Sequence, residues 1–256
     1  MSRLFLILVL FTPLTLAFAA RQLNGTNQAV AGSNCCMTIP AAASPNVSVS
    51  VWVYPTSSVT TTYNAFVNNQ FPGFFSYGLQ TDGSAHAVAC ITGNATYTCA
   101  VGPILSLNVW HHVGLVWDAP STLVRLYIDG VQAATAVSAA TQAGTTLPLA
   151  VGASYNAGCC QFWFAGRIAE AAIWSVALTP TEMSALAHGS APTLVRPSQS
   201  NGLPLYVYWP MHGIGTAEAN FSNSVIISGG NQTGQQFGSP PAAPHAPVGM
   251  PTGEGH

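Results

Sequence analysis

The stretch from Trp110 to Trp117 reads WHHVGLVW, and the stretch from Leu123 to Gly130 reads LVRLYIDG. In both, apolar side chains recur at every second position, which is typical of half-buried β-strands. The second stretch ends in Asp129-Gly130, and this pair favours a tight hairpin turn because the central residues need positive φ. The two stretches therefore predict adjacent antiparallel strands, with a third strand starting at Val131.

The same alternation occurs along much of the chain. Val47–Tyr54 alternates cleanly and predicts a strand that ends at Pro55. Thr179 is a good helix N-cap, Pro180 suits the first helical position, and Glu182 completes a capping box, so a short helix is predicted that stops at Gly189. Many strands with little helix between them predict an antiparallel sandwich. Further strands are expected near Ala65–Asn68, Phe74–Gln80, Ala85–Ile91 and Leu147–Gly152, with buried faces formed by Val47, Val49, Val51 and Val53, by Val113, Leu115 and Trp117, and by Val124, Leu126 and Ile128.

Two later segments complete a recognisable set. Phe164–Trp174 reads FAGRIAEAAIW, and Ala177–Glu182 reads ALTPTE. Together with the WHHV strand and the YIDG hairpin, they resemble the laminin-G-like, concanavalin-A-like lectin jelly-roll family, in which these motifs recur in this order. The resemblance covers residues 20–190 and implies an all-β, antiparallel two-sheet jelly-roll sandwich (concanavalin A-like) with one short capping helix.

The ends of the chain are predicted to lie outside this domain. Arg3 precedes an apolar run, and Ala17-Phe18-Ala19 has the small-x-small pattern of a signal-peptide site, so residues 1–19 are predicted to be removed. The alternative is an uncleaved anchor, but the run is short and contains Pro13. We therefore expect a secreted protein with no stable membrane insertion after cleavage.

The C-terminal part starts with a linker after residue 190. Leu205–Met211 reads LYVYWPM and resembles the Y-W-P-L strand that opens many family members. We interpret residues 191–237 as a linker plus added strands that complete the sandwich; a second, truncated domain is the alternative. Residues 238–256 are rich in Pro, Gly and Ala and predict a disordered tail.

Composition excludes some partners. Charged residues make up 5% of the chain, there is no Lys, and the net charge is −2 with five Arg. Such a chain has no electrostatic footprint for a phosphate backbone, so nucleic acid is not an expected partner. It also has no basic patch for anionic lipid.

The six cysteines fit an oxidising compartment. Cys90 and Cys99 flank a predicted hairpin whose tip is near Gly93-Asn94, so we expect them to face each other and form a disulfide. The family fold implies that the doublets Cys35-Cys36 and Cys159-Cys160 lie close enough to be cross-linked, although six cysteines permit fifteen pairings. Asn-x-Ser/Thr sequons occur at Asn94, at the hairpin tip and the best candidate for glycosylation, and at Asn24, Asn46, Asn220 and Asn231.

Catalysis is not indicated by the acidic residues. The family includes retaining glucanases, whose two carboxylates must lie about 5 Å apart on one strand face. No two carboxylates here are spaced that way: Asp129 is a turn residue and Glu182 a helix cap. His111 and His112 are adjacent on a strand, so they point to opposite faces and do not form a metal pair. We expect no enzymatic activity and no catalytic residue.

Candidate ligand groups gather in two loops at the expected rim of the sandwich. Sugars are bound by aromatic rings and by amide side chains that pair with hydroxyls. One loop, Tyr63–Phe74, offers Tyr63, Asn68 and Asn69, and the other, Tyr155–Trp163, offers Tyr155, Asn156 and Trp163. Some family members bind Ca²⁺ at this rim, and Asp82 and Asp118 are the turn carboxylates that would contribute. Calcium usually needs more carboxylates than this, so no cofactor is expected.

The sequence therefore predicts a secreted, non-catalytic recognition module that binds a glycan or a glycoprotein surface. The alternative is a structural or assembly subunit of an extracellular fibre, coat or virion surface. Its support is the nearly uncharged surface, which offers little repulsion between copies and permits self-association.

Overall fold

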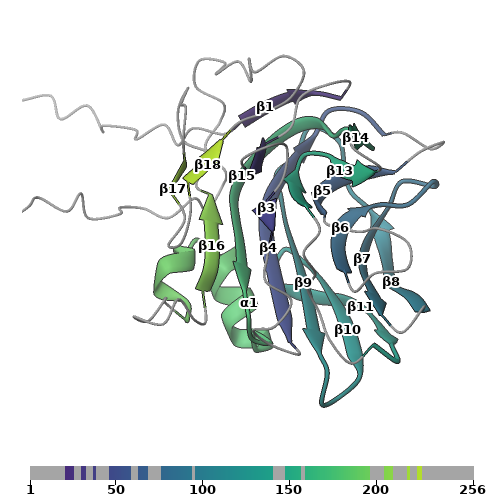
Figure 1. The fold of residues 1–256 in the computed structure, drawn as a ribbon, viewed down its shortest axis with the longest axis vertical. Coiled ribbons are helices and arrows are strands. Elements are labelled where there is room, and N and C mark those ends of the chain that lie inside the picture. The colour runs from purple at the N-terminus through teal and green to yellow at the C-terminus, as the bar shows by residue number, and fades with distance from the viewer. Residues whose placement is uncertain are drawn as a thin grey trace, which may run out of the picture.

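The protein is a sandwich of two antiparallel β-sheets (Figure 1). The computed structural model describes residues 21–25, 30–32, 37–38, 46–58, 63–68, 76–93, 96–140, 148–156, 159–196, 205–209, 218–219 and 224–226. The predicted signal peptide, residues 1–19, and tail, residues 238–256, lie outside these described residues. The predicted fold class is confirmed.

The first sheet, sheet A, has seven strands in the order β1-β15-β4-β9-β10-β11, with β16 also paired to β15. The WHHV and YIDG stretches form neighbouring strands in it, with Val124 opposite Trp117 and Leu126 opposite Leu115, as predicted. The strands are β1 (Arg21–Asn24), β4 (Val47–Pro55), β9 (His111–Asp118), β10 (Leu123–Ile128), β11 (Val131–Val137), β15 (Ala165–Trp174) and β16 (Leu205–Trp209).

The second sheet, sheet B, has nine strands in the order β17-β18-β2-β12-β5-β6-β7-β8, with β3 also paired to β12. A separate hairpin consists of β13 (Ser154–Asn156) and β14 (Cys159–Gln161). The strands of sheet B are β2 (Val30–Gly32), β3 (Met37–Thr38), β5 (Asn64–Asn68), β6 (Ser76–Thr81), β7 (His86–Gly93), β8 (Thr96–Ile104), β12 (Pro148–Val151), β17 (Glu218–Ala219) and β18 (Ser224–Ile226).

The core lies between the sheets and follows the predicted alternation. Val49, Val51 and Val53 are fully buried there with side chains from sheet B such as Phe66 and Leu79. Burial of apolar surface at this scale is the main stabilising contribution to such a fold. Val113, Leu115, Trp117, Val124 and Leu126 complete the predicted buried faces.

Turn and helix signals in the sequence match the structure. Asp129 and Gly130 have φ of 51° and 81°, the positive values that the predicted hairpin turn requires. The helix α1 (Pro180–Ala187) begins at the capping box formed by Thr179 and Glu182. Gly189 follows its end with φ of 93°. A short 3₁₀ helix, Pro192–Leu194, comes after it. In the described part of the chain, no helix has the length and apolar character needed to cross a membrane.

Part of the outer face of sheet A is covered by α1 (Figure 1), together with Val195. Trp174 is fully buried there, and its indole N–H donates to the backbone oxygen of Val195 at 2.8 Å. Gly114 in β9 leaves the space for Met183 of α1, whose Sδ would lie 2.5 Å from an added Cβ. We call this region the sealed face; it consists of Val116, Tyr127, Ala172, Trp174, Leu178, Met183, Leu186, Val195, Leu205 and Tyr208.

Cys90 and Cys99 form the predicted disulfide between β7 and β8, with their Cα atoms 4.1 Å apart. The second predicted pairing stays a prediction. Cys35 and Cys36 lie outside the described residues, and Cys159 and Cys160 are placed only by their backbone in β14. Of the sequons, Asn94, Asn220 and Asn231 also lie outside. Asn24 is part of β1, and the Asn46 side chain accepts a hydrogen bond from the Ala119 backbone at 2.9 Å.

Candidate functional site

One end of the sandwich contains a small cavity of about 20 Å³ that opens to solvent. It lies where β4, β6 and β8 end and β5 begins, so it sits between the two sheets at their rim. No charged side chain lines it. We call it the rim pocket, and its lining residues are Pro55, Ser57, Ser58, Asn64, Phe66, Thr81, Ala85, Ile104, Leu105, Leu107 and Phe164.

Local backbone geometry holds the pocket open. The β8–β9 loop turns at Asn108, whose φ is 58°, and the Asn108 backbone N–H donates to the Pro55 oxygen at 2.8 Å. This bond ties the loop to the end of β4. On the opposite wall, the turn between β6 and β7 places Ala85 at a φ of 67°. Positive φ is costly for a residue other than Gly, so this turn depends on the surrounding contacts.

The floor of the pocket is apolar and its edge is polar. Phe66 and Phe164 meet edge to face with ring centres 5.3 Å apart. Ser57 and Ser58 are exposed at the edge. Deeper in, the buried Thr81 Oγ1 accepts hydrogen bonds from the Asn64 backbone N–H at 3.0 Å and from its side-chain amide at 3.1 Å. Both bonds use the oxygen as acceptor, so the hydroxyl hydrogen is what Thr81 can donate to an occupant. Small-molecule sites commonly combine an apolar lining with a few such polar groups.

The start of the first predicted loop contacts the end of the second. The Tyr63 ring packs edge to face on Phe162, with ring centres 5.1 Å apart, and the Ala65 backbone N–H donates to the Phe162 oxygen at 2.8 Å. Tyr63 stays 39% exposed. Trp163 instead packs against Ala150 and Ala153. Neither Tyr63 nor Trp163 lines the cavity, but their chain neighbours Asn64 and Phe164 do.

Exposed apolar side chains flank the mouth. Ile104 is 56% exposed and Leu107 is 40% exposed, and both line the pocket. Val109 follows in the same loop and is also exposed. Single exposed apolar residues are common on protein surfaces, whereas a group of them beside a cavity is a feature of candidate binding sites.

Two histidine–aspartate pairs lie at the same end of the molecule. His86 Nδ1 is 3.1 Å from Asp82 Oδ2, and His111 Nδ1 is 3.0 Å from Asp129 Oδ2. Burial acts to raise the pKa of the Asp129 carboxyl, but hydrogen bonds from the His111 ring and the His112 backbone outweigh it and hold that pKa below its ordinary value. The same balance, with bonds from Ser84 and His86, lowers the pKa of Asp82.

The predicted ligand residue Asn68 has a different place from the one expected. It is fully buried, accepts a hydrogen bond from Ser154 Oγ at 3.1 Å and donates to Gln80 Oε1. The burial follows from its position on β5, where its side chain joins a network on the outer side of sheet B instead of pointing to solvent.

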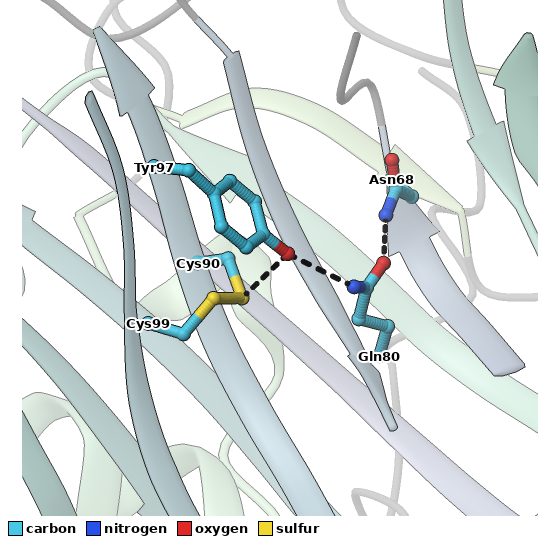
Figure 2. The surroundings of a disulfide bond; sticks show 5 residues. All are labelled: Asn68, Gln80, Cys90, Tyr97 and Cys99. Carbon is cyan, nitrogen blue, oxygen red and sulfur yellow. Dashed lines mark hydrogen bonds between the residues drawn. A yellow bond between two sulfur atoms is a disulfide. The ribbon is translucent and has the colours of Figure 1, made fainter. Parts of the chain in front are cut away.

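Figure 2 shows this network. Gln80 donates to the Tyr97 hydroxyl at 3.3 Å, and Tyr97 in turn lies 3.3 Å from Cys90 Sγ of the disulfide. Tyr97 is half exposed above it. Of the other predicted ligand residues, Tyr155 and Asn156 are placed by backbone only, in β13, and Asn69 lies outside the described residues.

The two predicted metal ligands lie at opposite ends of the sandwich and cannot share an ion. Asp82 is in the turn beside the rim pocket, where its Oδ1 accepts from the Ser84 and His86 backbone N–H groups at 2.8 and 2.9 Å. Asp118 ends β9 at the far end, where it accepts from Ser121 at 2.6 Å and pairs with Arg125 at 3.5 Å. Among the described residues, no group of three or more potential ligands gathers around one point.

Several polar groups on the outer face of sheet A are buried. His112 Nε2 is 2.8 Å from Ser50 Oγ, both side chains are enclosed, and the His112 ring lies edge-on to Trp52. Burial lowers the pKa of His112 to about 4 from an ordinary 6.5. Glu170, also buried, accepts a hydrogen bond from the Tyr208 hydroxyl. As predicted for the histidine doublet, His111 and His112 point to different surroundings.

Sequence reasoning missed most of the residues that line the rim pocket. Ser57, Ala85, Ile104 and Leu107 come from separate segments that only the folded chain brings together. One signal was present: Leu105-Ser106-Leu107-Asn108-Val109 is an apolar-rich segment in a loop between two strands. Loops are usually polar, so apolar residues there indicate a surface with another use.

Solved structures with the same fold include proteins named for carbohydrate binding, at low sequence identity. A Bacteroides ovatus protein named as a candidate carbohydrate binding protein matches 84% of this chain at 13% identity and a TM-score of 0.58, and the match spans 59% of that protein's length. The heptameric SAP-like pentraxin of Limulus polyphemus matches 67% of this chain and 82% of its own at 16% identity and a TM-score of 0.53.

A third structure is the CBM40 domain of the Ruminococcus gnavus IT-sialidase bound to alpha2,3 sialyllactose. It matches 66% of this chain and 96% of its own at 15% identity and a TM-score of 0.53. These identities show a shared fold only. No curated protein sequence matches the chain significantly.

The family, in contrast, is shown by the sequence itself. The laminin G model described as the concanavalin A-like lectin/glucanases superfamily matches residues 24–184, which include the Trp110–Trp117 strand, the Asp129-Gly130 turn and the start of α1. The chain belongs to the concanavalin A-like lectin/glucanases superfamily.

Proposed function

We propose that this chain is a secreted, non-catalytic recognition module that binds carbohydrate, or a glycosylated surface, at the rim pocket. The observation that carries the proposal is the pocket itself. An uncharged cavity combines apolar rings with hydroxyl and amide side chains, and the exposed Tyr63 ring, packed on Phe162, directly precedes the lining residue Asn64. Sugar rings present apolar C–H faces and hydroxyl edges, so this combination suits them.

The structural relatives support the choice of ligand class. Two of the three are named for carbohydrate binding, and one was solved with sialyllactose. The fold alone does not determine a ligand, because one fold hosts many functions. The proposed ligand class of this chain therefore depends on the chemistry of its own pocket.

A non-catalytic role is supported by what the described carboxylates do. Asp82, Asp118 and Asp129 hold turns through their hydrogen bonds. Glu182 caps α1 and pairs with Arg196, and Glu170 binds the Tyr208 hydroxyl inside the protein. Among the described residues, Ser50 and His112 are paired as in an activated nucleophile, but both side chains are buried. Each group thus has a structural role.

Secretion is supported by two independent features. The N-terminal segment ending at Ala19 has the features of a signal peptide. The Cys90–Cys99 disulfide is of a kind that persists in oxidising compartments. N-terminal sequencing of the protein recovered from the culture medium tests this part: a start at Ala20 supports it, and retention of residues 1–19 in a membrane fraction contradicts it.

The experiment that tests the function is a glycan array probed with the mature protein, together with Tyr63→Ala. We expect specific signals for the unchanged chain and a loss of at least about fivefold for the variant, because a stacking ring contributes on the order of 1 kcal/mol. The matched control is Tyr97→Ala, which removes an exposed tyrosine from the outer side of sheet B, away from the pocket. A blank array, or equal loss in both variants, would contradict the proposal.

A second candidate function, assembly into a fibre or coat, is favoured by one observation. The strand β11, at the end of sheet A's strand order, contains no charged residue and no Pro and exposes Val131 and Val137. Strands at sheet edges are usually protected by charge or Pro, because they otherwise pair with other chains. Light scattering on the array sample discriminates: growth of large assemblies with concentration, together with a blank array, favours the assembly function.

A further inference from the structure

The lining of the rim pocket narrows the class of sugar. Seven of its lining residues are apolar: Pro55, Phe66, Ala85, Ile104, Leu105, Leu107 and Phe164. The four polar ones, Ser57, Ser58, Asn64 and Thr81, are all neutral. An unmodified hexose carries a hydroxyl on nearly every carbon, and each hydroxyl placed against the apolar floor would lose its hydrogen bonds to water.

The charged side chains near the pocket narrow the class of sugar further. Acidic sugars are usually held by Arg or Lys, and the chain has no Lys. Of the Arg side chains in the described residues, Arg125 pairs with Asp118, Arg196 pairs with Glu182, and Arg167 lies over the Tyr54 ring at 5.0 Å. The charged groups closest in sequence to the pocket edge are Asp82 and its partner His86. A carboxylate on the ligand would therefore find no positively charged side chain in the pocket lining. It would instead lie near the negatively charged Asp82.

We infer that the rim pocket takes a methyl group of a neutral sugar, either the methyl of a 6-deoxyhexose or that of an acetamido group. This inference rests on the proposed function. The methyl packs on the floor near Phe66 and Phe164, while Thr81 and the serines at the edge serve the ring hydroxyls. Both sources present the same chemistry to the pocket, a methyl group beside hydrogen-bonding atoms.

The test compares matched sugar pairs by NMR titration of the mature protein. Methyl α-L-fucoside differs from methyl α-L-galactoside only in having a methyl in place of a CH₂OH group, and N-acetylglucosamine differs from glucose only in the acetamido group. Burial of one methyl is worth about fourfold in affinity, and the parent sugar buries an unpaired hydroxyl as well, so we expect a preference of at least about tenfold in one pair. The pair that shows it identifies the source of the methyl.

Two variants place the preference in this pocket. Ile104→Asn and Leu107→Asn make its mouth polar at side chains that are 56% and 40% exposed, so the fold should be retained. We expect each to lower the methyl preference to about twofold or less. The matched control is Val137→Asn at the far end of β11, 73% exposed, which should leave the preference unchanged.

The outcomes separate this inference from the proposed function. Equal affinity within both pairs, or a preference that survives Ile104→Asn and Leu107→Asn, overturns the inference and leaves carbohydrate binding in place. Binding on the array only to glycans that lack a deoxy or acetamido methyl would likewise overturn the inference and leave carbohydrate binding in place. A blank array together with no binding of the four sugars overturns both.

Discussion

The sealed face and the rim pocket contain similar side chains but differ in what covers them. On the outer face of sheet A, His112 lies beside Trp52 and Glu170 beside Tyr208, and all four side chains are buried. The helix α1 covers part of this face. At the rim, Asn64 and Thr81 are buried as well, but Ser57 and Ser58 are exposed and the cavity opens to solvent. The comparison teaches that a polar residue near an aromatic one indicates function only where the fold leaves it accessible.

The largest expected effect is a loss of stability when the sealed face is changed. Trp174→Ala should lower the free energy of unfolding by about 3–5 kcal/mol, because it empties a fully buried site on the sealed face. Trp174→Phe keeps most of the volume and removes the bond to Val195, so its cost should be nearer 1–2 kcal/mol. Urea unfolding gives both values. A loss below 1 kcal/mol for Trp174→Ala would show that the face is not sealed.

The second prediction concerns pH. Folding depresses the pKa of His112 from 6.5 to about 4, so between these values the unfolded chain binds a proton that the folded chain excludes. Stability should therefore fall as pH drops from about 6.5 to about 4, by on the order of 3 kcal/mol in total from this residue. Unfolding of His112→Gln followed over the same pH range should lack that part of the slope. Identical slopes in the two proteins would mean that His112 is accessible to water.

The disulfide gives an intermediate effect. Cys90→Ala combined with Cys99→Ala opens a link between residues nine apart and should cost about 2–3 kcal/mol through greater freedom of the unfolded chain. The link lies in the middle of β7 and β8, away from the rim ends of those strands, so sugar affinity per folded molecule should not change. Denaturation and titration of the same preparation test both statements. An unchanged unfolding midpoint would contradict the first, and lost affinity the second.

The smallest expected stability effect is at the rim. Ile104→Ala should change the free energy of unfolding by less than about 0.5 kcal/mol, since the side chain is mostly exposed. Its effect should instead be seen in the Kd for the sugar that binds best on the array, raised about fourfold. This pattern is the reverse of that for Trp174→Ala. Equal Kd values for the variant and the unchanged chain would remove Ile104 from the site.

Local signals explain why so much of the fold was predictable. The alternation around Trp110–Trp117, the Asp129-Gly130 turn and the capping box at Thr179 each depend on neighbouring residues, so the sequence shows them directly. The pairing of Cys90 with Cys99 is a hairpin contact of the same local kind.

The candidate site was less predictable because it depends on contacts between distant segments. Tyr63 directly precedes the lining residue Asn64, whereas Asn68, five residues later, joins a buried network on the outer side of sheet B. Ala85 and Leu107 reach the pocket from two turns far apart in sequence. Which residues are covered is decided by how the sheets and loops pack, and alternation along one strand carries no information on that.

We expect the ligand to bind at the rim pocket, and not on the sealed face or on the outer side of sheet B. Hydrogen exchange of the mature protein, with and without the glycan that binds best on the array, tests it most directly. With the glycan bound, we expect slower amide exchange in residues 55–58, 64–66, 81–85 and 104–107, and no change on α1 or around Tyr97. Slower exchange confined to β7 and β8 around Cys90, or no change in any of the rim segments while the glycan is bound, would contradict it.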